Sequence, residues 1–252
     1  MTALRVLRAL PRATALQTVL SVLCCSLLAA CSSDVSGPSA VERGQQLFDS
    51  KALSTSSLND FTCDSCHDLQ RTAPPPIKTG AALAGVTRRT QFWGGQEDDL
   101  LRAINDCRNY FMVDNQPLKA TDEDARALYA YLQSGEPGDD QPQPFTVVTN
   151  ILALPRGDAD SGNHLYVWAC ASCHGEMHDG SGRLSSRVPI LPEETLAAHT
   201  EFTPRVVRLI FTEKIRHGLF LNYSGTMPPF SAERLSDQDI SDLLEALGVL
   251  GE

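Results

Sequence analysis

Two copies of one short motif, Cys-x-x-Cys-His, carry the residues of this chain that could do chemistry. In this motif, two thiols three positions apart can each close a thioether bond to one of the two vinyl groups of a haem. The imidazole that follows is then held against one face of the iron. A four-ligand zinc site is disfavoured, because it needs further Cys or His at matched spacing. The sequence therefore predicts two covalently bound haem c groups, held by Cys63, Cys66, His67, Cys170, Cys173 and His174.

The first thirty residues are typical of a bacterial export signal rather than of a folded domain. A basic start with three arginines precedes an apolar run from Thr18 to Ala30, which is too short to span a membrane. The run ends in Leu28-Ala29-Ala30-Cys31, which resembles the lipoprotein box, where cleavage leaves a lipid-bearing Cys as the new N-terminus. Ser32 in place of Asp suggests the outer membrane in that family. We expect a lipid anchor at Cys31 and a place in the cell envelope, facing the periplasm; ordinary cleavage at a small residue is the alternative.

The remaining cysteines and the net charge fit an exported protein. Of the eight Cys, Cys24 and Cys25 leave with the signal, and Cys107 is left over once lipid and haem are assigned. The chain has a net charge of −10, and removing the three signal arginines leaves −13. A surface this negative argues against binding to nucleic acid and favours redox partner proteins with a basic docking surface. The same charge also serves solubility.

The rest of the chain predicts short helices around each motif and no convincing strand. Apolar residues recur at helical spacing, and capping residues stand before several of these segments. The expected helices run from about Val41 to Phe48, Asp98 to Met112, Thr121 to Leu132 (capped by Thr121), Asp160 to Cys170, Thr203 to His217 (stopped by Gly218), and onward from a cap at Ser236.

This order of helix, haem motif, loop, helix, ligand loop and final helix resembles the class I cytochrome c family, in two copies. The resemblance implies an all-α fold of two tandem domains in which each haem serves as the apolar centre of a segment too small to fold well without it. We predict a lipoprotein signal peptide at 1–30, a tether at 31–40, a first cytochrome c domain at 41–135, a linker at 136–155 and a second cytochrome c domain at 156–252.

The sixth iron ligand of the second domain is expected to be Met227. It stands in Gly225-Thr226-Met227-Pro228-Pro229, which resembles the family's Met-Pro ligand loop, and the prolines stiffen the backbone after the Met. Packing is the alternative role for Met227. Four histidines compete for the iron but are expected to lie mostly on the surface: His164, His178, His199 and His217.

In the first domain the distal ligand is either Met112 or Cys107. His67 is the only His of that domain, which excludes ligation by two of its own histidines. Met112 and Cys107 are five residues apart, so on a regular helix they face different directions and only one would reach the iron. Cys107 also lies on the apolar stripe of its helix, where a small core residue is expected.

A second resemblance concerns the stretch from Arg102 to the Thr121 helix. It is similar to the first haem domain of dihaem thiosulfate dehydrogenases and to the haem subunit of the periplasmic thiosulfate-oxidising complex, whose matching Cys is the distal thiolate. The flanks of Met112 depart from that family, which has an Arg- and Gly-containing stretch there. If the chain were an enzyme acting on a sulfur anion, Cys107 would be its catalytic residue, and four arginines, expected to be surface residues otherwise, could supply positive charge: Arg88, Arg89, Arg102 and Arg108.

The sequence thus favours a dihaem c-type cytochrome that transfers single electrons in the cell envelope. One alternative is a thiosulfate dehydrogenase-like oxidoreductase with catalysis at haem 1. The other is a haem-bearing docking subunit of a larger redox complex, whose expected sign is an exposed apolar patch around residues 145–154.

Overall fold

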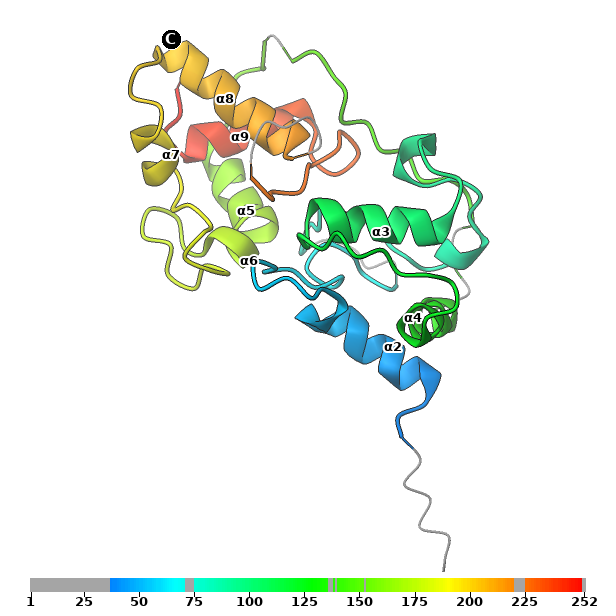
Figure 1. The fold of residues 1–252 in the computed structure, drawn as a ribbon. Coiled ribbons are helices and arrows are strands. Elements are labelled where there is room, and N and C mark those ends of the chain that lie inside the picture. Colours follow the sequence, from blue (N-terminus) through cyan, green and yellow to red (C-terminus); the bar gives the residue numbers. More distant parts are fainter. Residues whose placement is uncertain are drawn as a thin grey trace, which may run out of the picture. The chain divides into compact units, whose positions relative to one another are not determined.

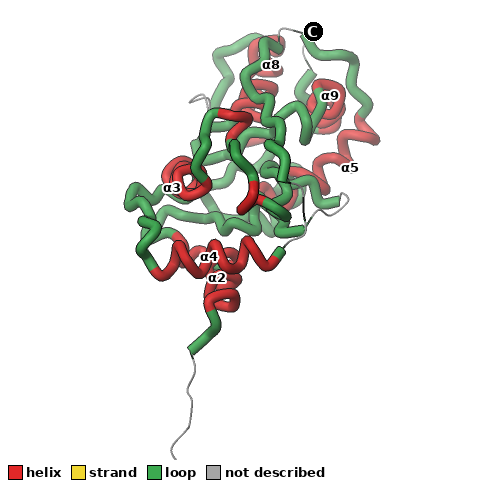
Figure 2. The backbone as a smooth tube through the Cα atoms, turned by 90° about the vertical axis from the view of Figure 1, so that its right-hand side faces the viewer, coloured by secondary structure: helices red, strands yellow, loops and turns green. Residues whose placement is uncertain are grey.

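The computed structural model describes residues 37–70, 75–135, 138, 140–151, 153–219 and 225–250. The predicted signal peptide and Cys31 lie outside these residues. The described part of the chain is built from helices and loops, with one isolated bridge between Phe92 and Glu97 and no β-strand (Figure 2). This confirms the predicted all-α fold class. None of the described helices is long and apolar enough to cross a membrane.

The helices fall close to the predicted segments. Around the first motif they are α2 (Ala40–Asp49), α3 (Leu100–Tyr110) and α4 (Glu123–Ser134), with short 3-10 turns η1 (Lys51–Leu53), η2 (Val86–Arg88) and η3 (Trp93–Gly95). Around the second motif they are α5 (Ala159–Ala169), α6 (Ala171–His174), α7 (Glu193–Ala197), α8 (Pro204–His217) and α9 (Asp237–Ala246) (Figure 1). The sequence missed α6, α7 and the 3-10 turns, which are too short to show a period.

Two of the predicted caps are confirmed and one is wrong. Thr203 accepts a hydrogen bond from the Val206 amide, and Ser236 accepts one from the Asp239 amide, so each begins its helix as expected. The start of α4 is different: its N-cap is Asp122, not Thr121. The Asp122 amide donates to Lys119 O at 2.9 Å and its carboxylate accepts from the Lys119 amide at 2.8 Å, which makes a turn one residue beyond Thr121.

A helix pair built in the same way forms the frame of each half of the chain. In the first, α2 packs on α4, and Gly44 faces Ala127 so closely that a Cβ on it would overlap the Ala127 carbonyl. In the second, α5 packs on α9, and a Cβ on Gly162 would overlap the carbonyl of Asp242. Because both helix pairs approach closely at a glycine that precedes the Cys-x-x-Cys-His motif, the repetition seen in the sequence extends to the packing of these helices.

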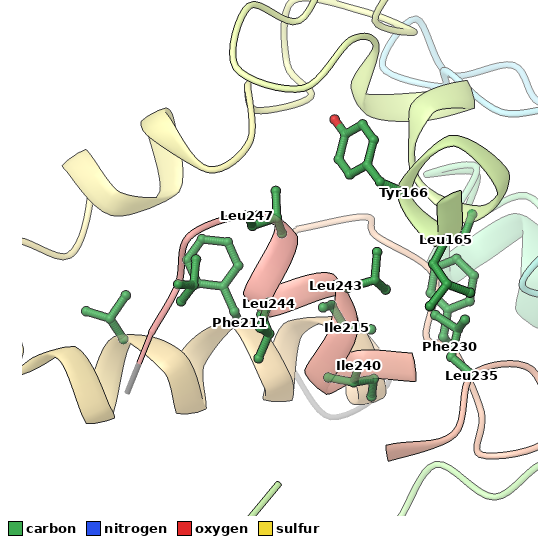
Figure 3. Packing of buried hydrophobic residues seen from close by; sticks show 13 residues of the cluster. Leu165, Tyr166, Phe211, Ile215, Phe230, Leu235, Ile240, Leu243, Leu244 and Leu247 are labelled. Carbon is green, nitrogen blue, oxygen red and sulfur yellow. The ribbon is translucent and has the colours of Figure 1, made fainter. Parts of the chain in front are cut away.

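The core of the second half lies where α9 meets α5 and α8. Leu243 and Leu244 of α9 are fully buried, and Phe211 of α8 and Leu165 of α5 belong to the same cluster (Figure 3). Their removal from water is the main favourable term for this half. The cluster also holds the helices that flank the second haem motif, so the core positions the site.

The two halves contact each other directly through backbone and side chains. The Ile77 amide donates to Trp168 O at 2.8 Å, and Arg187 forms an ion pair with Asp60 at 2.6 Å. The predicted linker contributes too, because the Ala232 amide donates to Thr146 O at 2.9 Å.

The apolar stretch at residues 145–154 is mostly buried against the rest of the chain. Val147 and Ile151 are buried, and the rings of Phe145 and Trp93 lie 5.6 Å apart. Among the described residues of 145–154, Val148 is the large exposed hydrophobic side chain. The described residues of this stretch therefore do not form the exposed patch expected for a docking subunit.

Candidate haem sites

Each Cys-x-x-Cys-His motif forms a single tight turn of the backbone. In the first copy the His67 amide donates to Cys63 O at 2.9 Å, and in the second the His174 amide donates to Cys170 O at the same distance. Thr62 and Ser65 brace the first turn, since each backbone amide donates to the other's hydroxyl. The two motifs are thus alike in backbone geometry as well as in sequence.

The two histidines make the same second contact. His67 Nδ1 lies 2.8 Å from Ala81 O, and His174 Nδ1 lies 2.9 Å from Pro189 O. A carbonyl oxygen can only accept, so Nδ1 must carry the proton and Nε2 keeps its lone pair for a metal. Burial lowers the pKa of both imidazoles, which keeps them neutral and able to ligate.

Gly80 allows the carbonyl at Ala81 to reach His67. The chain passes across the imidazole so closely at this point that a Cβ on Gly80 would overlap His67 Cε1 and Nδ1. The Gly80 amide also donates to Cys66 O at 2.9 Å, which ties the crossing segment to the motif. No local pattern in the sequence indicates this role for Gly80.

A cavity adjoins the first motif and brings together the predicted site residues of that half. Cys63, Cys66 and His67 form part of its wall, and both candidate distal ligands, Cys107 and Met112, line it as well. The rest of the lining is mainly apolar and includes Phe48, Leu53, Phe61, Val86, Leu128 and Leu132. Two thiols, a neutral imidazole and an apolar enclosure are what a covalently held haem requires, so the residues fit the group.

Burial raises the pKa of the thiols in both motifs. It moves that of Cys63 to about 12, Cys66 to about 11 and Cys170 to about 12. Burial raises the pKa of Cys107 too, so without a cation this side chain is a neutral thiol. A thiolate at Cys107 therefore needs the positive charge of an iron beside it.

The expectation that Cys107 and Met112 face different directions is wrong. The helix α3 ends at Tyr110, and Val113 has a left-handed φ of +53°, so Met112 lies on a turn and not on a regular helix. The turn brings the Met112 side chain back to the cavity that Cys107 faces from the last turns of α3. Because both side chains line the same cavity, Cys107 and Met112 both remain candidates for the distal iron ligand.

A buried arginine holds this distal turn in place. Arg108 is 3% exposed, and its Nη2 lies 2.7 Å from Asp114 Oδ2. Its Nε donates to Leu53 O at 2.9 Å and its Nη1 to Gln116 O at 2.6 Å. Arg108 is therefore a structural residue and not the surface side chain that the sequence suggested.

Arg216 has the same role in the second half. It is fully buried near the end of α8, donates to Phe230 O and Leu235 O, both at 2.7 Å, and pairs with Asp237 at 2.8 Å. These carbonyls follow the Met227 loop, so Arg216 fixes one end of it.

Contacts from the helix side hold the loop at Met227 itself. The Leu219 amide donates to Met227 O at 2.9 Å, and Gly218, at φ +48°, lets the end of α8 approach this carbonyl. Met227 and Cys170 both pack against the apolar cluster of the second half. The predicted distal ligand and one attachment thiol thus share one core.

The competing histidines occupy different environments. His164 and His178 are exposed, as expected, and His178 contacts Glu193 at 2.8 Å. His199 is half-buried beside Lys214. His217 is only 3% exposed and pairs with Glu213, so a surface position is wrong for it; the apolar face of α8 turns it inward.

The other arginines considered for an anionic substrate are engaged with protein groups. Arg102 pairs with Glu97 at 2.7 Å and with Asp98, and Arg88 donates to Gly138 O. Arg89 lines the cavity but donates to two backbone carbonyls, those of Ala82 and Ala84.

One part of the first cavity wall comes from the other half of the chain. Pro228, Pro229, Ser231 and Arg234 line it, although they follow Met227 in sequence. Such contacts between distant segments leave no local pattern, and sequence reasoning missed all four roles in the first site.

Comparison with known proteins matches the second half to a family. Residues 157–245 match the family described as cytochrome c oxidase, cbb3-type, subunit III. Over 205 residues the chain is 27% identical to the gluconate 2-dehydrogenase cytochrome c subunit of Pantoea cypripedii, which covers 77% of this chain and 44% of that protein. The thiosulfate dehydrogenase (TsdBA) structure from Marichromatium purpuratum is 19% identical, with a TM-score of 0.38, over 86% of this chain and 47% of that one. The chain thus spans less than half the length of either relative.

The family match includes the whole second motif and Met227. Cytochrome c domains bind haem covalently through such a motif and transfer electrons. Residues 157–245 therefore resemble a cytochrome c domain of the cbb3-type subunit III family, and domains of this kind carry covalently bound haem c.

Proposed function

We propose that this chain is a dihaem c-type cytochrome that passes single electrons between a haem in each half. The observation that carries this is the arrangement of the first half, which repeats that of the second. In both halves the His of a Cys-x-x-Cys-His turn has its Nδ1 held by a carbonyl oxygen, at 2.8 Å for His67 and 2.9 Å for His174, and in the first half a mainly apolar cavity adjoins the turn. The family match covers residues 157–245, so the haem of the first half is inferred from this repetition.

The chain's own residues would hold and shield the two haems. Cys63, Cys66, Cys170 and Cys173 are the attachment thiols, and His67 and His174 present Nε2 to the iron. The apolar walls exclude water, which limits the reorganisation that accompanies a change of charge. When bound, each haem supplies a one-electron ferric–ferrous couple, and the protein sets its potential through the ligands.

The two sites are close enough for a relay within one chain. Cys173 of the second motif packs against the apolar cluster of the first half. We propose that an electron entering at one haem leaves through the other. With Met227 as ligand, haem 2 has the higher potential if haem 1 carries a thiolate, because a thioether favours ferrous iron.

The distal ligand of haem 1 decides between carrier and enzyme, and a set of three variants tests it. If Cys107 binds the iron, Cys107→Ala abolishes a low-spin ferric signal unlike that of His/Met, together with any thiosulfate-driven reduction of haem. If Met112 binds it, Met112→Leu removes the haem 1 signal and Cys107→Ala leaves it intact. Met227→Leu is the matched control, since it should keep haem 2 attached, lower its potential and remove its near-red Met–iron band. Electron spin resonance and absorption spectra of the oxidised protein measure all three.

We favour the carrier over the sulfur-anion oxidoreductase. The cavity around Cys107 is mainly apolar, and Arg102 and Arg108 are paired with carboxylates. An anionic substrate would have to leave water for a site with few uncommitted donors, which is costly. Reduction of haem by thiosulfate in the unmodified protein would contradict this preference.

We propose redox proteins as the partners. The relative from Pantoea cypripedii is a cytochrome c subunit of a dehydrogenase, which supports a dehydrogenase as the electron donor. The net charge of −13 expected for the mature chain favours a donor or acceptor with a basic docking surface, and such binding weakens as salt is added. A haem-bearing subunit that serves one larger complex is the alternative, and co-purification of a single stable partner from native membranes would favour it.

We also propose that the protein is a lipoprotein of the cell envelope that is anchored through Cys31 and faces the periplasm. The sequence Leu-Ala-Ala-Cys after a short apolar run supports this. We expect Cys31→Ser to leave the signal uncleaved or to release the protein into the soluble fraction, because the acyl chains supply the membrane affinity. Cell fractionation and the mass of the N-terminal peptide measure the outcome, and an unchanged lipidated product would count against this site.

A further inference from the structure

Arg234 is the charged residue among the four that the second half contributes to the first cavity. It lies between the Met227 loop and α9, and its neighbours in the cavity wall, Pro228, Pro229 and Ser231, are neutral. A half-buried guanidinium at an apolar wall has to be compensated, because a charge removed from water is costly. The charge of Arg234 must therefore be compensated by groups other than its neighbours in this wall.

Contacts with the first half hold Arg234 in this wall. Its Nε donates to Lys78 O at 2.7 Å. Lys78 is fixed in turn, since its Nζ lies 2.9 Å from Asp68 and 3.0 Å from Asp64 and donates to His67 O at 3.2 Å. Among the described residues, neither Nη atom of Arg234 makes a hydrogen bond. The side chain is thus anchored at Nε, with the carboxylate of Asp68 as a nearby opposite charge.

Arg234 and the proximal histidine, His67, line the same cavity, so the guanidinium places a fixed positive charge at the wall of the first site. Burial lowers the pKa of Arg234, yet a guanidinium remains protonated in a protein. In a partly buried site this charge is screened less than one on the surface.

We infer that Arg234, a residue of the second half, raises the reduction potential of the haem held by the first half. This rests on the proposed function, because it requires a haem at Cys63, Cys66 and His67. Reduction adds one electron from the donor to the iron, and a fixed positive charge at the wall stabilises that added negative charge. The carboxylates of haem are the anions that would meet the Nη groups. The second half would then control the electron affinity of the first site as well as its own.

Three variants test the inference by redox titration followed in the visible spectrum. Arg234→Gln should lower the potential of haem 1 and leave that of haem 2 unchanged, and Arg234→Lys should keep most of the original value. The control Arg205→Gln removes the same charge from an exposed position on α8 and should shift neither haem. Haem 1 is identified as the titrating component that disappears in a Cys63→Ser/Cys66→Ser chain.

The outcomes separate this inference from the proposed function. Two haems per chain with an unchanged haem 1 potential in Arg234→Gln would overturn the inference alone. So would an equal shift of both haems, or a drop that Arg234→Lys does not restore. A single haem on the unmodified chain, measured on the same samples by mass, would contradict the proposed function itself.

Discussion

Replacing Cys63 and Cys66 with serine should leave one haem on the chain in place of two. A hydroxyl cannot close a thioether to a vinyl group, so the first site loses its covalent hold, whereas Cys170 and Cys173 are untouched. We expect the mass of the protein, matured in a host with the c-type assembly machinery, to fall by one haem. The first half should also lose stability, because an apolar cavity that the haem would fill is then exposed to water.

The matched control is Cys107→Ser, which changes a thiol of the same cavity that is not part of a motif. It should leave both haems covalently attached, whichever distal ligand haem 1 has. Retention of two haems by the double variant, or loss of a haem in the control, would contradict the assignment of the attachment residues.

The second large effect is expected at the helix crossing of the second half. Gly162→Ala should lower the free energy of unfolding by about 2 kcal/mol, because the new Cβ would overlap the carbonyl of Asp242 and force α5 away from α9. Helix propensity alone predicts the opposite change, because alanine in a helix is favoured over glycine by about 1 kcal/mol. A loss of stability would therefore report the overlap with Asp242. Chemical denaturation of the haem-loaded chain, followed by far-ultraviolet circular dichroism, measures the change.

Asn163→Ala is the control for this variant, because it introduces the same residue one position along α5 at an exposed site. It should be neutral or slightly stabilising. Equal stability of Gly162→Ala and the unmodified protein would mean that the two helices do not cross at this glycine.

The sequence could predict the elements whose signals are local. The caps at Thr203 and Ser236 bind the amides of their own first turns, and the apolar spacing of α8 and α9 follows from the faces they bury. The haem motifs are equally local, since thiols and imidazole lie within five residues. The N-cap at Asp122 was missed because two neighbouring residues, Thr121 and Asp122, can both cap, and a bond to Lys119 chooses between them.

The features that sequence reasoning could not reach depend on contacts between distant segments. Arg108 is expected at the surface from its sequence, yet it donates to the carbonyl of Gln116, and Arg216 donates to that of Phe230, far along the chain from the end of α8. Arg234 lies more than 150 residues from Lys78, whose carbonyl oxygen accepts its Nε–H. The cavity that holds both Cys107 and Met112 depends on where α3 ends, which periodicity does not fix to within a residue.

The most direct test of the account is the intact mass of the chain after maturation with the c-type assembly machinery. Two complete motifs, each with its histidine held by a carbonyl oxygen, predict two covalent haem additions on every chain. A single addition, located by peptide mapping to Cys170 and Cys173, would contradict the dihaem assignment and leave one cytochrome c domain beside a cavity of another kind.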